Sequence, residues 1–246
     1  MTAGGAPHLS PSADEVERRL RHPAVIVTRP IILGGINVLS AARSLQWKAE
    51  GLERLRDLEP PLILAANHQS HADTAAILGT LPRPLRERTV VAAALDVFGN
   101  GSVPSLKREC LQLVVAAGFH AFGFDRHGPP LRSLRTAAQL VRNGWNLLMF
   151  PEGTRSRSGQ MAPFKAGVGV LARFTRRAVV PVHLEGGRRI LPCGAFFPRP
   201  GCVTVCYGPP LRYGQRDTLE GFAARVEEAV REASREVGAG TQPGAP

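Results

Sequence analysis

Short apolar segments alternate with helical segments along most of this chain, and this alternation restricts the fold more than any other feature. Apolar runs of strand length occur at residues 61–66, 90–94, 119–124, 145–150, 179–184 and 203–207. Helical patterns lie between them and after them, at residues 73–81, 104–116, 129–144, 165–174 and 218–237. Continuous apolar strands are typical of parallel sheets that helices cover on both faces. The sequence therefore predicts an α/β fold with a largely parallel, mixed sheet flanked by helices.

The N-terminal 46 residues differ from this pattern. A capping box, Ser12-Ala-Asp-Glu15, opens a short helix that continues to about Leu20, and an apolar helical segment follows to about Leu45. The run at residues 24–42 is broken by Arg29-Pro30 and does not predict a transmembrane span. We divide the chain into an N-terminal segment (1–46), an α/β domain (47–237) and a disordered tail (238–246).

Two interpretations of the N-terminal segment follow from its composition. It can form two short helical pieces on a membrane surface, or it can pack on the α/β domain as an ordinary helix. In the first interpretation, nearby arginines lie at the level of the lipid headgroups. These are Arg18, Arg19, Arg21, Arg29 and Arg43.

The charge of the chain predicts an anionic partner. The sequence has 31 Lys+Arg against 20 Asp+Glu, a formal net charge of +11, and only three of the basic residues are lysines. Nucleic acid, anionic lipid and phosphorylated small molecules all fit this charge. The four cysteines show no CxxC spacing, and the N-terminus lacks the apolar core of a signal peptide. We therefore expect buried thiols and a reducing compartment.

A polar cluster, Asn67-His68-Gln-Ser-His71-Ala-Asp73, follows the strand predicted at residues 61–66. A neutral imidazole can accept a proton from an alcohol, and a carboxylate on its other nitrogen fixes the tautomer. Residues five apart are separated by about 140° on a regular helix, so His68 and Asp73 meet only if the chain bends before the helix begins. Asp73 could instead be the helix N-cap.

Metal binding is the other chemistry open to this cluster. His68, His71 and Asp73 could be metal ligands, but no further ligand is evident nearby. His71 is expected to be solvated or to contact a site residue without touching the substrate. The chain contains no G-x-S-x-G, Walker A or G-x-G-x-x-G motif. We expect no metal and no cofactor, and His68 would have to activate the substrate itself.

A second cluster follows the strand predicted at residues 145–150 and reads Phe150-Pro-Glu-Gly-Thr-Arg-Ser-Arg-Ser-Gly159. Its small residues permit a tight loop with exposed N–H groups, and Arg155 and Arg157 could bind a phosphate. Glu152 could orient these arginines or contact an acceptor hydroxyl. The same residues could also form an ordinary charged surface loop.

Two weaker features complete the set. The strand predicted at residues 119–124 ends in Phe122-Gly-Phe-Asp125-Arg126, an acid followed by a cation. The strand predicted at residues 179–184 contains Pro181, which is typical of an edge strand or of a bulge beside a ligand. His183, on the same strand, is expected to be a core histidine.

These four features, in this order, resemble the four motifs of the PlsC-type glycerolipid acyltransferases, a family that includes the 1-acylglycerol-3-phosphate O-acyltransferases. Asn67-His68-x-x-x-x-Asp73 is similar to the first motif, and residues 150–156 match the third. Residues 122–126 are similar to the second motif, although Gly123 stands where the family carries Ile or Phe. Val180-Pro181-Val182 resembles the fourth.

The resemblance implies roles for these residues. It implies that His68 is the general base and Asp73 its orienting carboxylate, both catalytic. It implies that the acceptor phosphate is bound by Arg126 and by Glu152, Gly153, Thr154 and Arg155. Pro181 would have an acyl-chain or structural role.

The resemblance also implies the reaction and its partners. A fatty acyl group would pass from acyl-CoA or acyl carrier protein to the free hydroxyl of lysophosphatidic acid or a related lysophospholipid. Such an enzyme works at a membrane surface, so we expect a peripheral or monotopic protein on the cytoplasmic side. A lyso-aminolipid acceptor and a catalytically silent, lipid-binding protein are the alternatives. A nucleic-acid partner is not expected, since aromatic residues make up only 6% of the chain and no binding module is present.

Overall fold

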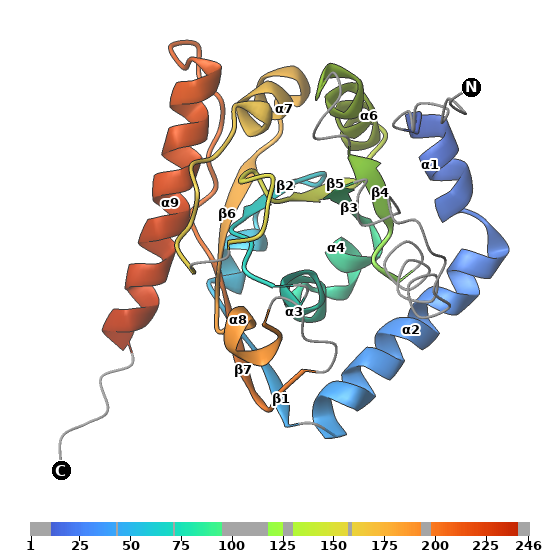
Figure 1. Ribbon diagram of the computed structural model, residues 1–246. Helices are drawn as coiled ribbons and strands as arrows, with labels where there is room; N and C mark the ends of the chain where they lie inside the picture. The colour runs from blue at the N-terminus through green and yellow to red at the C-terminus, as the bar shows by residue number, and fades with distance from the viewer. Residues whose placement is uncertain are drawn as a thin grey trace, which may run out of the picture.

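The computed structural model describes residues 11–42, 44–70, 72–94, 118–124, 130–156, 159–192 and 198–240. Within them lies a seven-stranded sheet with the order β1-β7-β6-β2-β5-β3-β4 (Figure 1). The strands are β1 Leu45–Glu50, β2 Ile63–Ala66, β3 Thr89–Ala94, β4 Ala121–Phe124, β5 Asn146–Met149, β6 Val179–Glu185 and β7 Gly201–Tyr207. The helices are α1 Ala13–Leu20, α2 Pro23–Ala42, η1 Leu52–Leu55, α3 Ala72–Thr80, α4 Arg83–Glu87, α6 Pro130–Arg142, α7 Gly167–Thr175, α8 Gly187–Ile190 and α9 Leu219–Gly240.

The predicted mixed, largely parallel sheet is confirmed. Strands β4, β3, β5, β2 and β6 are parallel neighbours, whereas β7 is antiparallel to β6 and β1 is parallel to β7. The strand β1 was not predicted. It lies at the edge of the sheet and is mostly half-buried or exposed, so its sequence, Leu-Gln-Trp-Lys-Ala-Glu, lacks the apolar continuity of the central strands. The predicted helix at residues 104–116 falls outside the described residues.

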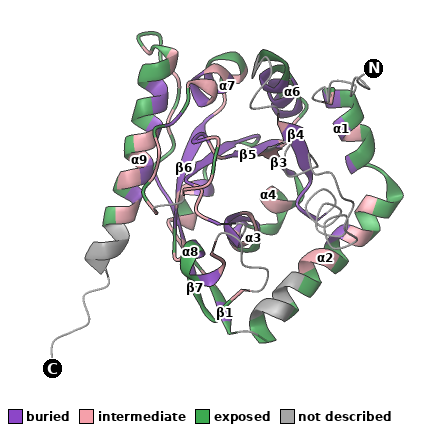
Figure 2. Ribbon diagram, in the orientation of Figure 1, coloured by how far each residue is buried: buried purple, intermediate pink, exposed green. Residues whose placement is uncertain are grey.

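Apolar side chains cover both faces of the sheet, which explains why the central strands are apolar throughout. In β2, Ile63 and Ala65 belong to the core cluster formed with α1, α6, α7 and α9. Leu64 and Ala66 point to the opposite face and join the cluster formed with α3 and α8. Figure 2 shows the central strands buried between these two layers. Polar groups can therefore gather only at the ends of the strands.

The apolar run at residues 24–42 lies in one continuous helix, whereas the membrane-surface interpretation divided it into two short pieces. Pro30 lies inside α2, which is continuous over 20 residues. Arg29 does not lie at headgroup level, because it is 7% exposed and donates hydrogen bonds to the carbonyl oxygens of Arg86, Glu87 and Gly118. Burial lowers the pKa of this guanidinium to about 10. Arg29 thus fixes α2 to the body of the protein. No helix among the described residues combines the length and apolar character that a membrane span needs.

Candidate active site

The site lies at the carboxyl ends of β2, β5 and β6, the edge at which a parallel sheet binds ligands. Asn67 is the first residue after β2 and is 2% exposed. Its side-chain oxygen accepts a hydrogen bond from the N–H of Leu184 (2.7 Å), and its amide nitrogen donates to the carbonyl oxygen of the same residue (3.1 Å). The Asn67 amide therefore prolongs the pairing of β2 with β6 by one residue and fixes the start of the turn that carries His68.

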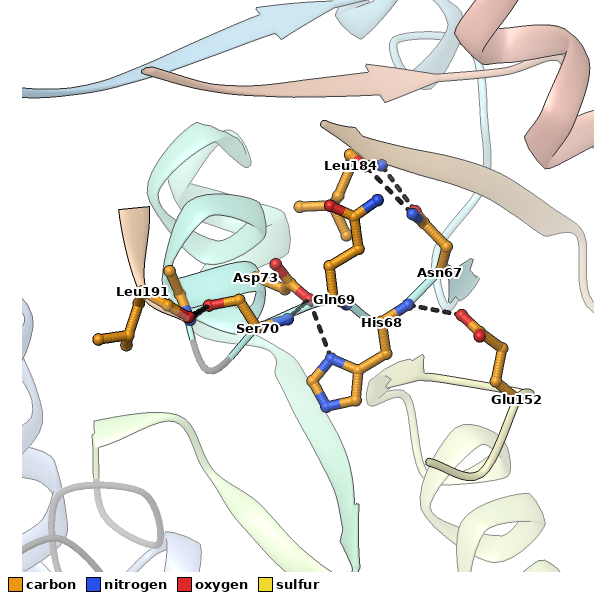
Figure 3. A network of polar contacts seen from close by, with 9 residues as sticks. Asn67, His68, Gln69, Ser70, Asp73, Glu152, Leu184 and Leu191 are labelled. Atoms are coloured by element: carbon orange, nitrogen blue, oxygen red, sulfur yellow. Dashed lines mark hydrogen bonds and ion pairs between the residues drawn. The ribbon is translucent and has the colours of Figure 1, made fainter. Parts of the chain in front are cut away.

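His68 and Asp73 are brought together by this turn (Figure 3). Nδ1 of His68 lies 3.0 Å from Oδ2 of Asp73. The same oxygen accepts hydrogen bonds from the backbone N–H groups of Gln69 (2.6 Å) and Ser70 (2.7 Å). The chain bends before α3 begins at Ala72, as the pairing required. Asp73 is the second residue of that helix, so it is not the N-cap.

This geometry determines what the pair can do chemically. The Asp73 side chain is fully buried, whereas the His68 side chain is 18% exposed. An ionised carboxylate only accepts hydrogen bonds, so Nδ1 of His68 carries the proton and Nε2 is left with a free lone pair. In Figure 3 the far edge of the imidazole points away from Asp73. Nε2 is therefore the atom that can accept a proton from a substrate.

The imidazole plane is held by Phe150, the residue after β5. The two rings are stacked, with centroids 4.0 Å apart and an angle of 18° between their planes. Such a contact restricts rotation of the imidazole about its side-chain bonds. The second predicted cluster thus contributes to the site through its aromatic residue as well as through its polar ones.

Glu152 holds the backbone of His68. The residue is 3% exposed; Oε1 accepts a hydrogen bond from the N–H of His68 (2.7 Å), and Oε2 accepts one from the N–H of Ala162 (2.8 Å). The N–H of Ser156 donates to the carbonyl oxygen of His68 (2.9 Å). Burial raises the pKa of Glu152, and the two hydrogen bonds oppose this rise. Both carboxylate oxygens therefore accept hydrogen bonds from backbone N–H groups. The expected contact of Glu152 with an acceptor phosphate stays a prediction.

The remaining loop residues have different exposures. Gly153 has φ +74°, and a Cβ there would lie 2.8 Å from Nζ of Lys165, so this position favours glycine. Thr154 is exposed and Arg155 is half-buried. Lys165 was not among the predicted site residues, because its position after the loop gave no sign that it folds back beside Gly153. The phosphate-binding roles of Gly153, Thr154 and Arg155 stay predictions.

Pro181 lies in a central strand, so the edge-strand interpretation is wrong. β6 pairs with β2 on one side and with β7 on the other. On the β7 side, Val179 bridges to Leu211, and continuous pairing begins again at Val182. Pro181, which has no N–H to donate, occupies the interruption between them. The expectation of a bulge beside a ligand and the role of Pro181 near the acyl chain stay predictions.

Five predicted residues fall outside the described residues: Arg43, His71, Asp125, Arg126 and Arg157. The second motif is therefore described only as far as Phe124, at the end of β4. Among the described residues, no group of three or more His, Cys, Asp or Glu side chains could hold a metal ion.

Sequence reasoning missed Gly187, at the start of α8. A Cβ at this position would overlap Oδ1 of Asp73 and lie 3.4 Å from Cβ of Ser70. Oδ1 is buried and has no hydrogen-bond partner within the described part of the chain. Gly187 therefore leaves the space that the carboxylate needs. The sequence offers only Gly186-Gly187 as a signal, about 115 residues from Asp73, and no local rule connects the two.

The fold and the histidine at the end of a parallel strand place the chain among α/β enzymes. A family model described as Acyltransferase matches residues 46–185, more than half of the chain. The chain therefore belongs to the acyltransferase family, and the predicted resemblance to PlsC-type members is confirmed.

Three similar proteins support this assignment. The chain is 29% identical over 179 residues to 1-acyl-sn-glycerol-3-phosphate acyltransferase LPAT1, chloroplastic, of Arabidopsis thaliana, covering 69% of this chain and 45% of that protein. It is 28% identical over 204 residues to a Pseudomonas aeruginosa 1-acyl-sn-glycerol-3-phosphate acyltransferase, covering 78% of this chain and 70% of that protein. The crystal structure of the 1-acyl-sn-glycerophosphate acyltransferase PlsC from Thermotoga maritima aligns with a TM-score of 0.62 and 24% identity, over 90% of this chain and 86% of that one.

The matches cover only part of some relatives, and this limits which of their properties can be assigned to this chain. The chain spans between a third and a half of the length of several plant relatives, at 34%, 39% and 45%. The similarity to the Thermotoga structure, at 24% identity, shows a shared fold.

Proposed function

We propose that the chain transfers a fatty acyl group from an acyl thioester to the free hydroxyl of lysophosphatidic acid or a related lysophospholipid. The observation that carries this proposal is the 3.0 Å contact between Nδ1 of His68 and Oδ2 of Asp73 at the end of β2. The names of the Arabidopsis and Pseudomonas relatives, both 1-acyl-sn-glycerol-3-phosphate acyltransferases, support the choice of acceptor.

His68 acts as the general base in this proposal. Nε2 takes the proton of the acceptor hydroxyl as the oxygen attacks the thioester carbonyl carbon. A C–O bond forms, the C–S bond breaks, and the thiolate leaves with the proton held by the imidazolium. Asp73 stabilises that imidazolium while it exists. The reaction has no covalent enzyme intermediate and draws on no metal or redox cofactor.

In this proposal Arg155 binds the acceptor phosphate near this base, with Gly153 and Thr154 completing the loop. Arg126, which lies outside the described residues, is proposed as a second phosphate ligand on the resemblance of its motif alone. In such an acceptor, the phosphate is attached to the carbon next to the one that carries the free hydroxyl. The phosphate-binding site therefore has to lie close to Nε2 of His68. The loop after β5 meets this requirement, because Glu152 and Ser156 contact the backbone of His68 itself. Arginine is well suited to this role because its guanidinium binds phosphate through two parallel hydrogen bonds.

We propose further that α2 lies against the cytoplasmic membrane surface. Its exposed large apolar side chains, Ile26, Val27, Ile31 and Val38, are each at least 60% exposed. On a helix they fall within an arc of about 140°. Arg29 and Leu33 fall outside this arc and contact the body of the protein. An apolar face held in a fixed orientation is what a peripheral enzyme with lipid substrates needs.

The proposal is tested by measuring acyl transfer from acyl-CoA and from acyl carrier protein to a panel of lysolipids that includes a lyso-aminolipid. His68→Asn should lower kcat by about 10²–10⁴. The matched control is His22→Asn, an exposed histidine whose Nδ1 accepts the N–H of Ala24, since asparagine can still cap that group. Wild-type protein that binds anionic lipid but transfers no acyl group would favour the silent lipid-binding alternative.

A further inference from the structure

An open pocket of about 680 Å³ lies beside the turn that carries His68. Gln69, from that turn, and Gly159, from the loop after β5, form part of its wall. The rest of the wall includes Glu185, at the end of β6, and the arginines Arg188, Arg189 and Arg199. The pocket therefore adjoins the candidate active site, although none of its arginines belongs to the four motifs.

The pocket and the imidazole lie on different sides of the turn. In Figure 3 the side chain of Gln69 extends toward Leu184, whereas the imidazole of His68 points the opposite way. A group bound against Gln69 is therefore separated from Nε2 by the backbone of the turn. A ligand that uses both places has to be long enough to pass around it.

The charge of the pocket favours an anion. Glu185 lies 3.8 Å from the guanidinium of Arg189, and both side chains are more than half exposed. Within the described ranges, neither Arg188 nor Arg199 has a carboxylate oxygen within 4.0 Å. Formally, one carboxylate faces three guanidinium groups, which leaves two positive charges. The planar guanidinium group binds phosphate groups through two parallel hydrogen bonds.

The pocket wall opposite α8 leaves space for the guanidinium group of Arg188. Gly159 has φ +91°, and a Cβ there would lie 2.9 Å from Nη1 of Arg188. Arg188 thus extends from α8 to the loop after β5, and the absence of a side chain at residue 159 gives its guanidinium room. A volume of several hundred Å³ is within the range of small-molecule sites.

We infer that this pocket binds the phosphate groups of the coenzyme A portion of an acyl-CoA donor. The inference rests on the proposed acyl-transfer function. An acceptor phosphate is too close to its hydroxyl to reach around the turn while that hydroxyl contacts Nε2. In acyl-CoA, by contrast, the long pantetheine arm separates the thioester from the nucleotide and its three phosphates. The thioester can therefore lie at His68 while the phosphates lie among Arg188, Arg189 and Arg199.

The test is the double variant Arg188→Gln/Arg199→Gln, assayed with acyl-CoA and with the truncated thioester acyl-N-acetylcysteamine, which has no phosphate. We expect the preference for acyl-CoA over the truncated donor to fall at least about tenfold, since each lost charge-assisted hydrogen bond weakens binding severalfold. The KM for acyl-CoA should rise about tenfold more than the KM for the acceptor. Adenosine 3′,5′-bisphosphate should inhibit the wild-type protein competitively against acyl-CoA, and the double variant much less.

The control is Arg173→Gln/Arg216→Gln, which removes the same charge from exposed positions near the opposite end of the sheet. A rise confined to the acceptor KM would assign the pocket to the acceptor headgroup and overturn the inference. Equal effects in the two double variants would show that the arginines act only through the overall surface charge, which would also overturn the inference. Turnover with acyl carrier protein but not with acyl-CoA would do the same while leaving the proposed function intact. No turnover with any donor would instead refute the proposed function.

Discussion

Replacing Asp73 by asparagine separates the charge of the carboxylate from its position. The backbone N–H groups of Gln69 and Ser70 donate to Oδ2 at 2.6 and 2.7 Å, so the asparagine oxygen should occupy that place and the NH₂ group the place of Oδ1. His68 then keeps the same tautomer and orientation. Coulomb's law across 3.0 Å, at an effective dielectric constant of about 20, gives roughly 5 kcal/mol for the lost attraction to an imidazolium.

The expected effect of Asp73→Asn on turnover follows from this energy. The imidazolium is only partly formed in the transition state, so about half to all of the energy is lost, which corresponds to a fall in kcat of about 10²–10⁴. The assay is steady-state acyl transfer at saturating donor, with the acceptor KM and the thermal melt measured in parallel. A folded variant with near wild-type KM and a loss in kcat below about tenfold would refute the role of Asp73 in stabilising a charged His68.

Two further substitutions test the groups that position this pair. Glu152→Gln leaves one acceptor oxygen for two backbone N–H groups, so we expect a loss of roughly 1–3 kcal/mol in stability. We also expect a lower kcat, because the backbone of His68 loses a hydrogen bond. Chemical denaturation and initial rates measure the two effects, and an unchanged denaturation midpoint would contradict the reasoning. Gly187→Ala places a Cβ against Oδ1 of Asp73 and should lower kcat at least about tenfold with little change in acceptor KM, whereas Gly34→Ala, which has no atom within 4 Å of its new Cβ, should retain wild-type turnover. Equal activity of the two alanine variants would show that the carboxylate has room to move.

Local sequence was sufficient to predict the central part of the fold. Residues 61–66 read as a strand buried on both faces, and β2 buries Ile63 and Leu64 in opposite clusters. The same local pattern predicted that polar residues follow this strand, since an apolar strand between two helical layers leaves its end as the place for His68. Edge strand β1 escaped prediction because a strand with one partner and partial exposure need not be apolar.

The sequence also predicted that His68 and Asp73 could pair, but only the tertiary structure decided that they do. Their separation of five residues permits a pair or a helix cap, and the choice depends on where α3 begins. Contacts distant in sequence fixed that point, because Asn67 bonds to Leu184 and Glu152 bonds to the N–H of His68. Hydrogen bonds across more than 80 residues leave no periodic signal in a single chain.

The same distinction explains the charged residues. The sequence determined the number of arginines and the excess of positive charge, and it indicated an anionic partner. It did not decide that Arg29 is buried against the carbonyl groups of the last two residues of α4, or that Arg188 and Arg199 line one pocket. An arginine side chain is long and can serve solvent, backbone or ligand from the same position in the chain. Which of these it serves is settled by what the rest of the fold brings within its reach.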